Sequence, residues 1–273
     1  MTELALDDQN RLAPWRARAA VLLALIALSV SGTAWLLDGV GEGGDLSLWD
    51  RPTLGWLVAH RQPMATTLLT DVTTAGGEVV LTVVAVLTVL LLALRRRRVE
   101  AFLLAVALGG AELVSVVLKQ VVGRARPPAD LMLGPVERTL SFPSGHTIGT
   151  ATFTLALAYL WWRARPSAPR AWLGFGAAIV LTTVMAISRL YLGDHWLTDV
   201  LASIVLAVGV VSGVVLLDTW WQRRSRRSPG ATQAVSSPVG PAGGQPLLQR
   251  GRAVAPGAGR DERDDDHDRD GDD

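Results

Sequence analysis

Long apolar stretches separated by short polar connections make up most of the chain before Gln222. Six of these stretches have the length, roughly 17–25 residues, that an α-helix needs to cross the hydrocarbon core of a bilayer. They cover residues 19–37, 72–94, 101–118, 146–162, 171–188 and 196–217. The pattern therefore predicts an all-α fold, an integral membrane bundle of six transmembrane helices.

The connections between these stretches differ in their content of Lys and Arg. If the six helices alternate in direction, one side receives 14 such residues and the other receives seven. The richer side carries Arg11, Arg16, Arg18, Arg95 to Arg98, Arg163, Arg165, Arg170, Arg223, Arg224, Arg226 and Arg227. Because Lys and Arg collect in cytoplasmic loops, we expect both termini in the cytoplasm. The connections 38–71, 119–145 and 189–195 then lie outside the cytoplasmic membrane.

The two ends of the chain differ from its apolar part. Arg16 and Arg18 precede the first stretch, as in a signal peptide, but its 19 uncharged residues exceed the roughly 7–15 of a signal core, so we interpret it as a retained helix. The end of the chain is rich in Pro, Gly and Ser and closes on an acidic run, a composition that cannot bury a core. We expect a cytoplasmic N-terminal segment (1–18), a six-helix membrane domain (19–221) and a disordered cytoplasmic tail (222–273).

Composition narrows the classes of function. Hydrophobic residues make up 49% of the 273 residues and the mean hydropathy is +0.31, which is typical of a membrane protein. A net charge of +1 gives no excess of cations and disfavours a nucleic-acid partner. The absence of cysteine excludes disulfides, thiolate metal sites and a cysteine nucleophile. Chemistry must use other side chains, among them four histidines and a single lysine, Lys119.

Two polar stretches before the fourth apolar stretch carry residues that membrane insertion does not require. Lys119 closes the third apolar stretch and Arg126 follows seven residues later, just before Pro127. Taken alone, this is typical of basic residues that reach toward lipid headgroups. Ser144 is a natural N-cap, and the helix that starts there offers a positive dipole end to an anion. His146 at this point either exchanges protons near neutral pH or simply faces water.

The third polar stretch, Ser188 to Asp199, joins the last two apolar stretches. His195 and Asp199 are four residues apart, so on a helix they share a face and the carboxylate can hold one imidazole nitrogen. The other nitrogen then becomes a better nucleophile, as in the base-and-orienter arrangement of a catalytic triad. Taken singly, such a pair is more often a structural hydrogen bond.

The predicted topology places all three stretches at the same, outer membrane face, where they can converge. Lys119, Arg126 and Arg189 would neutralise the oxygens of a tetrahedral anion. One histidine would attack phosphorus while a second protonates the leaving oxygen. This chemistry requires no metal ion and no other cofactor.

The three stretches also carry a resemblance. Read as Lys-x6-Arg-Pro (Lys119 to Pro127), Pro-Ser-Gly-His (Pro143 to His146) and Ser-Arg-x5-His-x3-Asp (Ser188 to Asp199), the chain resembles the type 2 phosphatidic acid phosphatase family. All three spacings match over about 80 residues, and the six-helix layout extends the likeness to roughly Leu12 through Trp221. Soluble vanadium-dependent haloperoxidases share these motifs, but six predicted membrane helices argue against that group.

The resemblance implies a role for each motif residue. His195 would be the nucleophile that becomes phosphorylated, Asp199 would support it, and His146 would donate a proton to the leaving group. The phosphate would be bound by Lys119, Arg126, Ser144, Gly145 and Arg189. The implied substrates are lipid phosphates and diphosphates, including phosphatidic acid, phosphatidylglycerol phosphate and undecaprenyl diphosphate.

Other functions remain open at this point. A lipid phosphotransferase would use the same histidine but pass the phosphoryl group to an acceptor other than water. A transporter of anionic lipids would place its binding groups near the midplane of broken helices, whereas these charges lie mostly at helix ends. Glu112, inside the third apolar stretch, points to a buried partner, because a charge is costly there. The sequence leaves open the lipid, the oligomeric state and the role of the acidic tail.

Overall fold

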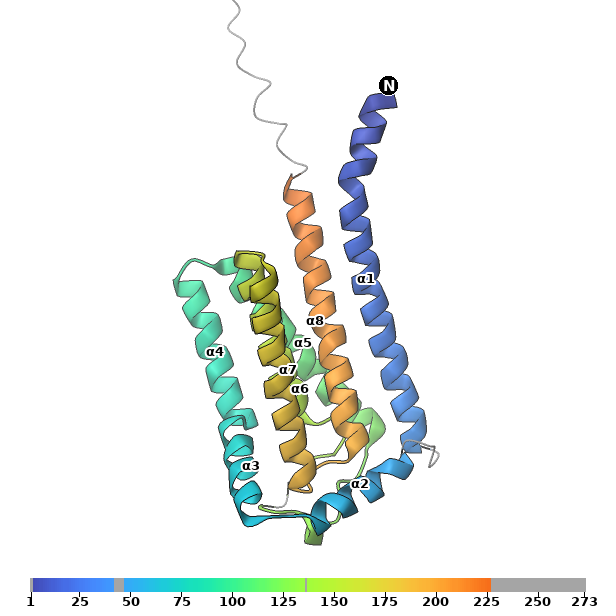
Figure 1. The fold of residues 1–273 in the computed structure, drawn as a ribbon, viewed down its shortest axis with the longest axis vertical. Helices are drawn as coiled ribbons and strands as arrows, with labels where there is room; N and C mark the ends of the chain where they lie inside the picture. Colours follow the sequence, from blue (N-terminus) through green and yellow to red (C-terminus); the bar gives the residue numbers. More distant parts are fainter. Residues whose placement is uncertain (1, 42–46, 136, 227–273) are drawn as a thin grey trace, which may run out of the picture. The chain divides into compact units, whose positions relative to one another are not determined.

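The computed structural model describes residues 2–41, 47–135 and 137–226, and within these ranges the fold is all-α (Figure 1). The helices are α1 (Thr2–Gly41), α2 (Ser47–Ala59), α3 (Pro63–Ala75), α4 (Glu78–Leu94), α5 (Arg98–Val122), the 3-10 turn η1 (Ala129–Leu131), α6 (Gly145–Ala164), α7 (Ala168–Tyr191) and α8 (Leu197–Arg226). The predicted all-α class is confirmed for this part of the chain. The predicted tail, 222–273, lies almost wholly outside the described residues.

Several of these helices are long and apolar enough to cross a membrane, as expected of a multi-pass membrane protein. Four described segments meet that condition alone: Trp15–Asp38, Arg98–Val122, Ala168–Tyr191 and Leu197–Ser225. A fifth span is possible if α3 and α4, which meet at an angle of 43°, act as one broken span. Six spans and the orientation of the termini therefore remain predictions.

Of the six predicted membrane helices, α6 is the one that is not among the four or five candidate spans. It has 20 residues, long enough for a bilayer core, but four of them are threonines (Thr147, Thr150, Thr152 and Thr154). It packs against α5, α7 and α8, and 11 of its residues are buried in protein. A helix surrounded by other helices needs less apolar surface than one that faces lipid, which explains its lower hydropathy.

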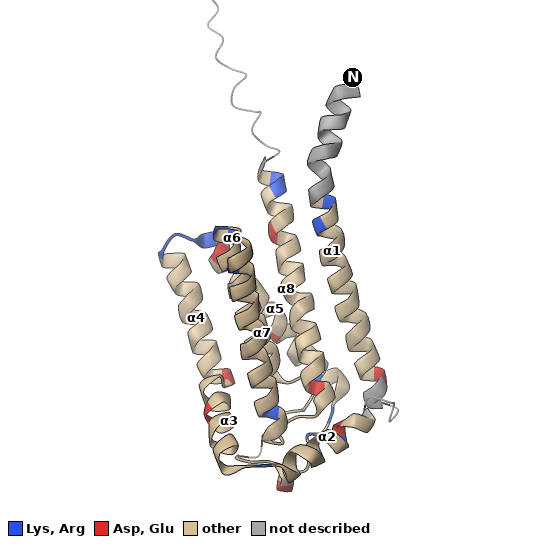
Figure 2. Ribbon diagram, viewed as in Figure 1, with Lys and Arg blue, Asp and Glu red and all other residues tan. Residues whose placement is uncertain are grey.

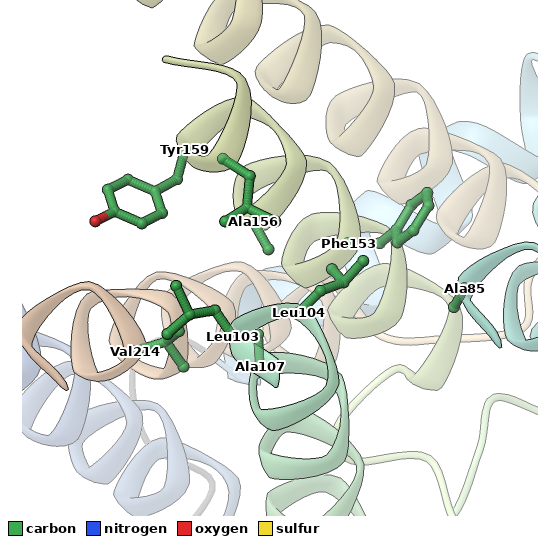
Figure 3. Packing of buried hydrophobic residues seen from close by; sticks show 9 residues of the cluster. Ala85, Leu103, Leu104, Ala107, Phe153, Ala156, Tyr159 and Val214 are labelled. Atoms are coloured by element: carbon green, nitrogen blue, oxygen red, sulfur yellow. The ribbon is translucent and has the colours of Figure 1, made fainter. Parts of the chain in front are cut away.

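The core lies where α5, α6 and α8 meet. Leu103, Leu104 and Ala107 of α5 pack against Phe153 of α6 and Val214 of α8 (Figure 3). Small residues bring other helices together, because backbones can approach closely where side chains are short. A Cβ at Gly209 of α8, for example, would lie 2.2 Å from the Ser29 hydroxyl of α1. That hydroxyl donates a hydrogen bond of 2.8 Å to the Val205 carbonyl, which fixes α1 on α8.

Charged side chains mark both ends of the bundle. Arginines gather where α4 meets α5, where α6 ends and where α8 ends (Figure 2). At this end the buried Asp218 of α8 accepts hydrogen bonds from Tyr159 (2.6 Å), Arg163 (2.6 Å) and Gln222 (2.7 Å). These donors repay the cost of burying the carboxylate and join α6 to α8.

At the other end, α2 is tied to the start of α8 by Asp50, whose side chain is 3% exposed. One carboxylate oxygen accepts from the Thr198 N–H (2.9 Å), and the other accepts from the Thr198 hydroxyl (2.8 Å) and from Arg124 (2.5 Å). The carboxylate thereby satisfies a backbone donor in the first turn of α8, at the positive end of the helix dipole. Asp50 therefore holds α2 against the helix end that carries Asp199.

Removing Asp50 should destabilise the protein. In Asp50→Ala the Thr198 N–H loses its acceptor and Arg124 loses one of its carboxylates, so we expect a loss of about 3–5 kcal/mol in the free energy of unfolding. Thermal unfolding in detergent measures it. The exposed Asp38 is the matched control, and Asp38→Ala should unfold with the wild type. Equal midpoints for Asp50→Ala and the wild type would show that this network contributes nothing.

The predicted orientation can be tested by labelling, because the chain has no cysteine. We expect an impermeant thiol reagent to label Asp130→Cys, in η1, in intact cells and to spare Arg97→Cys, in the α4–α5 connection. Both positions are exposed, so access through the membrane decides the result. If Arg97→Cys were labelled and Asp130→Cys were spared, the topology would be the inverse of the predicted one.

Candidate active site

The three polar stretches meet at one end of the bundle. Arg126 comes from the α5–α6 connection, His146 from the first turn of α6, Arg189 from the last turn of α7 and His195 from the α7–α8 connection. Arg126 Nη1 lies 3.1 Å from His195 Nε2, and His146 is within electrostatic reach of Arg189, His195 and Arg126. The convergence predicted for these residues is what the structure shows.

His195 is buried, and its two ring nitrogens have different partners. Nδ1 lies 3.4 Å from the Asp199 carboxylate, whereas Nε2 faces Arg126. A guanidinium can only donate hydrogen bonds, so Nε2 must present its lone pair and Nδ1 must carry the proton. Burial lowers the pKa of His195 to about 4, although Asp199 opposes the shift. The imidazole is therefore neutral at pH 7, with the Nε2 lone pair directed toward Arg126.

Asp199 is surrounded by donors. Oδ2 accepts from the Ser141 hydroxyl (2.5 Å) and the Trp196 N–H (3.0 Å) in addition to facing His195. Oδ1 accepts from Arg124. A carboxylate with this many donors stays ionised inside the protein and holds a fixed position. The sequence singled out Asp199 and His195 but gave no reason to connect Ser141 or Arg124 with them.

Two buried guanidinium groups form the anion-binding part of the site. Arg126 is fixed by bonds to the carbonyls of Thr139 (2.7 Å) and Asp194 (2.8 Å). Arg189, whose side chain is 2% exposed, lies 3.0 Å from the Asp194 carboxylate. Both arginines therefore point at the same place with their orientation set by the surrounding loops, which is the geometry that binds carboxylate or phosphate.

The carboxylate of Glu137 occupies that place. One oxygen lies 2.5 Å from Arg189 and the other 2.5 Å from Arg126. Burial alone would raise the pKa of Glu137, but the two guanidinium groups outweigh it and hold the pKa below its usual value. Sequence reasoning missed Glu137, because an acidic residue in a connection rich in Arg is most simply a surface charge.

The other predicted phosphate ligands lie around this clamp but already have protein partners. Lys119 Nζ donates to the Leu140 carbonyl at 2.9 Å. Ser144 is the N-cap residue of α6, yet its hydroxyl makes no capping bond and accepts instead from Thr147 (3.1 Å). The Ser144 N–H donates to Ser203 at 2.8 Å. A role for these residues and for Gly145 in binding phosphate stays a prediction.

The turn that presents His195 needs a glycine. Gly193 has φ +83°, and a Cβ there would lie 2.5 Å from the Leu131 carbonyl. Arg61 braces the same turn with bonds to the carbonyls of Leu131 (2.7 Å) and Tyr191 (3.0 Å). The α2–α3 connection, which carries Arg61, therefore helps to position His195, a link that the sequence pattern could not indicate.

Two further acidic residues, Glu112 and Glu78, line a groove beside the site. Glu112 is exposed on α5, so the buried partner expected for it is not found; it lines an apolar groove between α4, α5 and α6. Glu78, at the start of α4, lines the same groove and lies 3.8 Å from His146 Nδ1. Among the described residues, no group of three or more His, Asp or Glu side chains is arranged to hold a metal ion.

Comparison with known proteins bears on this site. A family model described as the PAP2 superfamily matches residues 100–224. Phosphatidylglycerophosphatase B of Bacillus subtilis is 29% identical over 152 residues, which are 55% of this chain and 74% of that protein. A putative undecaprenyl-diphosphatase of Escherichia coli is 41% identical over 83 residues, 30% of this chain and 35% of that protein. Decaprenylphosphoryl-5-phosphoribose phosphatase of Mycobacterium tuberculosis is 35% identical over 108 residues, 39% of this chain and 53% of that protein. The chain thus spans about a third and about half of the last two relatives.

A solved structure is also similar. The crystal structure of the first transmembrane PAP2 type phosphatidylglycerolphosphate phosphatase from Bacillus subtilis has a TM-score of 0.64 and 25% identity, covering 71% of this chain and 95% of that one. The segment matched by the family model contains all three motifs in order, with His195, Asp199, Arg126 and Arg189 brought together as described above. Residues 100–224 therefore match the PAP2 superfamily, and the chain is homologous to phosphatases of that family.

Proposed function

We propose that this protein is a membrane-bound phosphatase of lipid phosphates or diphosphates that works through a phosphohistidine on His195 at the outer face of the cytoplasmic membrane. The observation that carries the proposal is the placement of His195 Nε2. It is a neutral nitrogen 3.1 Å from one of two guanidinium groups that converge on an anion. A nucleophile next to preorganised cations is what phosphoryl transfer requires.

In the first step, the substrate phosphate replaces the Glu137 carboxylate between Arg126 and Arg189. His195 Nε2 attacks phosphorus, so an N–P bond forms while the bond from phosphorus to the leaving oxygen breaks. His146 gives a proton to that oxygen. The His195 ring gains positive charge, and the Asp199 carboxylate beside Nδ1 stabilises it.

In the second step, water replaces histidine on phosphorus. His146, now neutral, takes a proton from a water molecule, and the water oxygen attacks phosphorus while the bond to His195 Nε2 breaks. Inorganic phosphate leaves, His195 is again neutral and His146 is again protonated. The charge on the transferred group is carried throughout by arginine side chains, so the proposed mechanism is independent of a metal ion.

The surroundings of the site favour a lipid substrate. A groove of about 480 Å³ between α4, α5 and α6 begins at Gly145, next to His146, and its walls are mostly aliphatic. An acyl or polyprenyl chain would lie there while its phosphate reaches the arginines. The three relatives compared above are named for substrates that carry a phosphate or diphosphate on a lipid. The excess of Lys and Arg in the connections on the opposite side supports an outer position for the site.

Substitution of each of the two histidines should reduce activity in a way that depends differently on the leaving group. His195→Ala should be inactive on both p-nitrophenyl phosphate and a lipid monophosphate, because no covalent step remains. His146→Ala should lose about 10²–10⁴-fold on the lipid, whose alkoxide needs a proton, and much less on the aryl ester. Asp199→Asn should lie between them. The measurement is kcat/KM on both substrates in EDTA. An equal loss of kcat/KM on the two substrates for His146→Ala would contradict the mechanism. Loss of wild-type activity in EDTA that Mg²⁺ restores would also contradict it.

Glu137 should compete with phosphate-like anions. In Glu137→Gln the arginine clamp loses its charged occupant, so we expect vanadate to inhibit at about tenfold lower concentration, a difference of about 1.4 kcal/mol. Because the pKa of Glu137 is lowered, the carboxylate is ionised above that pKa and the difference should be constant from neutral to mildly acidic pH. Asp130→Asn, an exposed acid of the same connection, is the control. Equal or weaker vanadate inhibition of Glu137→Gln would show that Glu137 does not compete.

A further inference from the structure

His146 has an unmet hydrogen-bonding need. Its Nδ1 is buried and has no hydrogen-bond partner among the described residues. Burying a polar atom without a hydrogen-bond partner is unfavourable, because the atom loses its bonds to water. The acidic side chain nearest to this nitrogen by ion-pair distance is Glu78, whose Oε1 lies 3.8 Å away. The side chain of Glu78 is 61% exposed, so it has freedom to move.

Local backbone structure directs Glu78 toward His146. Glu78 is the first residue of α4 and follows Gly76 and Gly77, where α3 and α4 meet at 43°. On the facing helix, a Cβ at Gly145 would lie 2.1 Å from Glu78 Oε1. The carboxylate therefore fills the space that the missing side chain of Gly145 leaves free. The bend between α3 and α4 and the glycine at the start of α6 together allow this acid to lie beside the imidazole.

We propose that Glu78 is the positioning residue of the proton donor: it accepts the Nδ1–H of His146, directs Nε2 toward the leaving oxygen and stabilises the protonated ring. A shift of under about 1 Å in the flexible Glu78 side chain would bring the two atoms to hydrogen-bond distance. This inference rests on the proposed function, in which His146 protonates the leaving group. The site then contains two carboxylate–histidine pairs, Asp199 with the nucleophile and Glu78 with the donor.

The other charges around His146 do not replace Glu78. Arg189, Arg126 and a protonated His195 would all repel a positive charge on His146, whereas Glu137 attracts it. In the proposed reaction, however, Glu137 leaves the clamp when phosphate enters. Glu78 is then the protein carboxylate that stays beside the donor during the transfer.

A competing role for Glu78 would be to balance the charge of Lys119, with which it also interacts electrostatically. The two roles predict different kinetics. If Glu78 acted on Lys119, its loss would change phosphate binding for every substrate alike. If it positions His146, its loss should matter more as the leaving group becomes a poorer anion, because such groups depend on the donated proton.

The test is a series of aryl phosphates with increasing leaving-group pKa, assayed with the full-length protein in detergent. The slope of log kcat/KM against leaving-group pKa should steepen strongly in His146→Ala and partly in Glu78→Gln, with about a ten- to hundredfold loss on the poorest leaving group. Glu78→Asp should recover part of the loss. The double variant Glu78→Gln/His146→Ala should have the slope of His146→Ala. Asp71→Asn, an exposed acid on α3, should keep the wild-type slope.

Gly145→Ala is a second way to move the Glu78 carboxylate. It provides a test of the same inference if Glu78→Gln folds poorly. Its new Cβ should displace Glu78 and steepen the slope in the same sense, and it should add nothing to the slope of Glu78→Ala. A wild-type slope in both Glu78→Gln and Gly145→Ala, beside a steep one in His146→Ala, would overturn this inference and leave the proposed function intact. A wild-type slope in His146→Ala would overturn both.

Discussion

The ionised carboxylate of Asp199, held inside the protein at the first turn of α8, is the constraint from which the site is built. Burying a charge costs several kcal/mol, and the cost is met only if donors surround it. Ser141 and Arg124 come from the α5–α6 connection and the Trp196 N–H from the chain just before α8. Satisfying this one group therefore assembles segments far apart in the sequence, and it leaves His195 beside the carboxylate with a defined tautomer.

The two arginines of the site, Arg126 and Arg189, impose a second electrostatic constraint. Arg126 and Arg189 are buried, and without an anion between them they would repel each other in a medium of low dielectric. Glu137 meets that need in this structure, and in the proposed reaction the substrate phosphate would meet it. The same electrostatic demand that would attract phosphate thus explains why an acid of the chain itself lies there. In the proposed reaction, Glu137 would also ease release of the product phosphate by replacing it between the two arginines.

The sequence predicted those features that depend on pattern along the chain. The length of the apolar stretches located most of the long apolar helices. The spacing of His195 and Asp199 predicted that the two side chains lie together, although His195 precedes α8. The sequence could not predict features that depend on packing between segments. The Asp50–Arg124 pair, the Glu137 bridge and Ser141 beside Asp199 join residues between 11 and 74 positions apart. Two expectations also needed knowledge of neighbours: α6 is less apolar than a lipid-facing helix because protein surrounds it, and Glu112 lines a groove instead of meeting a buried partner.

Trapping the covalent intermediate would show whether His195 is the nucleophile. Wild-type protein would be mixed with a radiolabelled lipid phosphate, quenched in alkali and digested, and the labelled peptide would be identified by mass spectrometry. We expect phosphate on the imidazole of His195, stable in alkali and labile in acid, and absent from His195→Ala. Phosphate on an aspartate or serine, or turnover that persists in His195→Ala, would contradict this expectation.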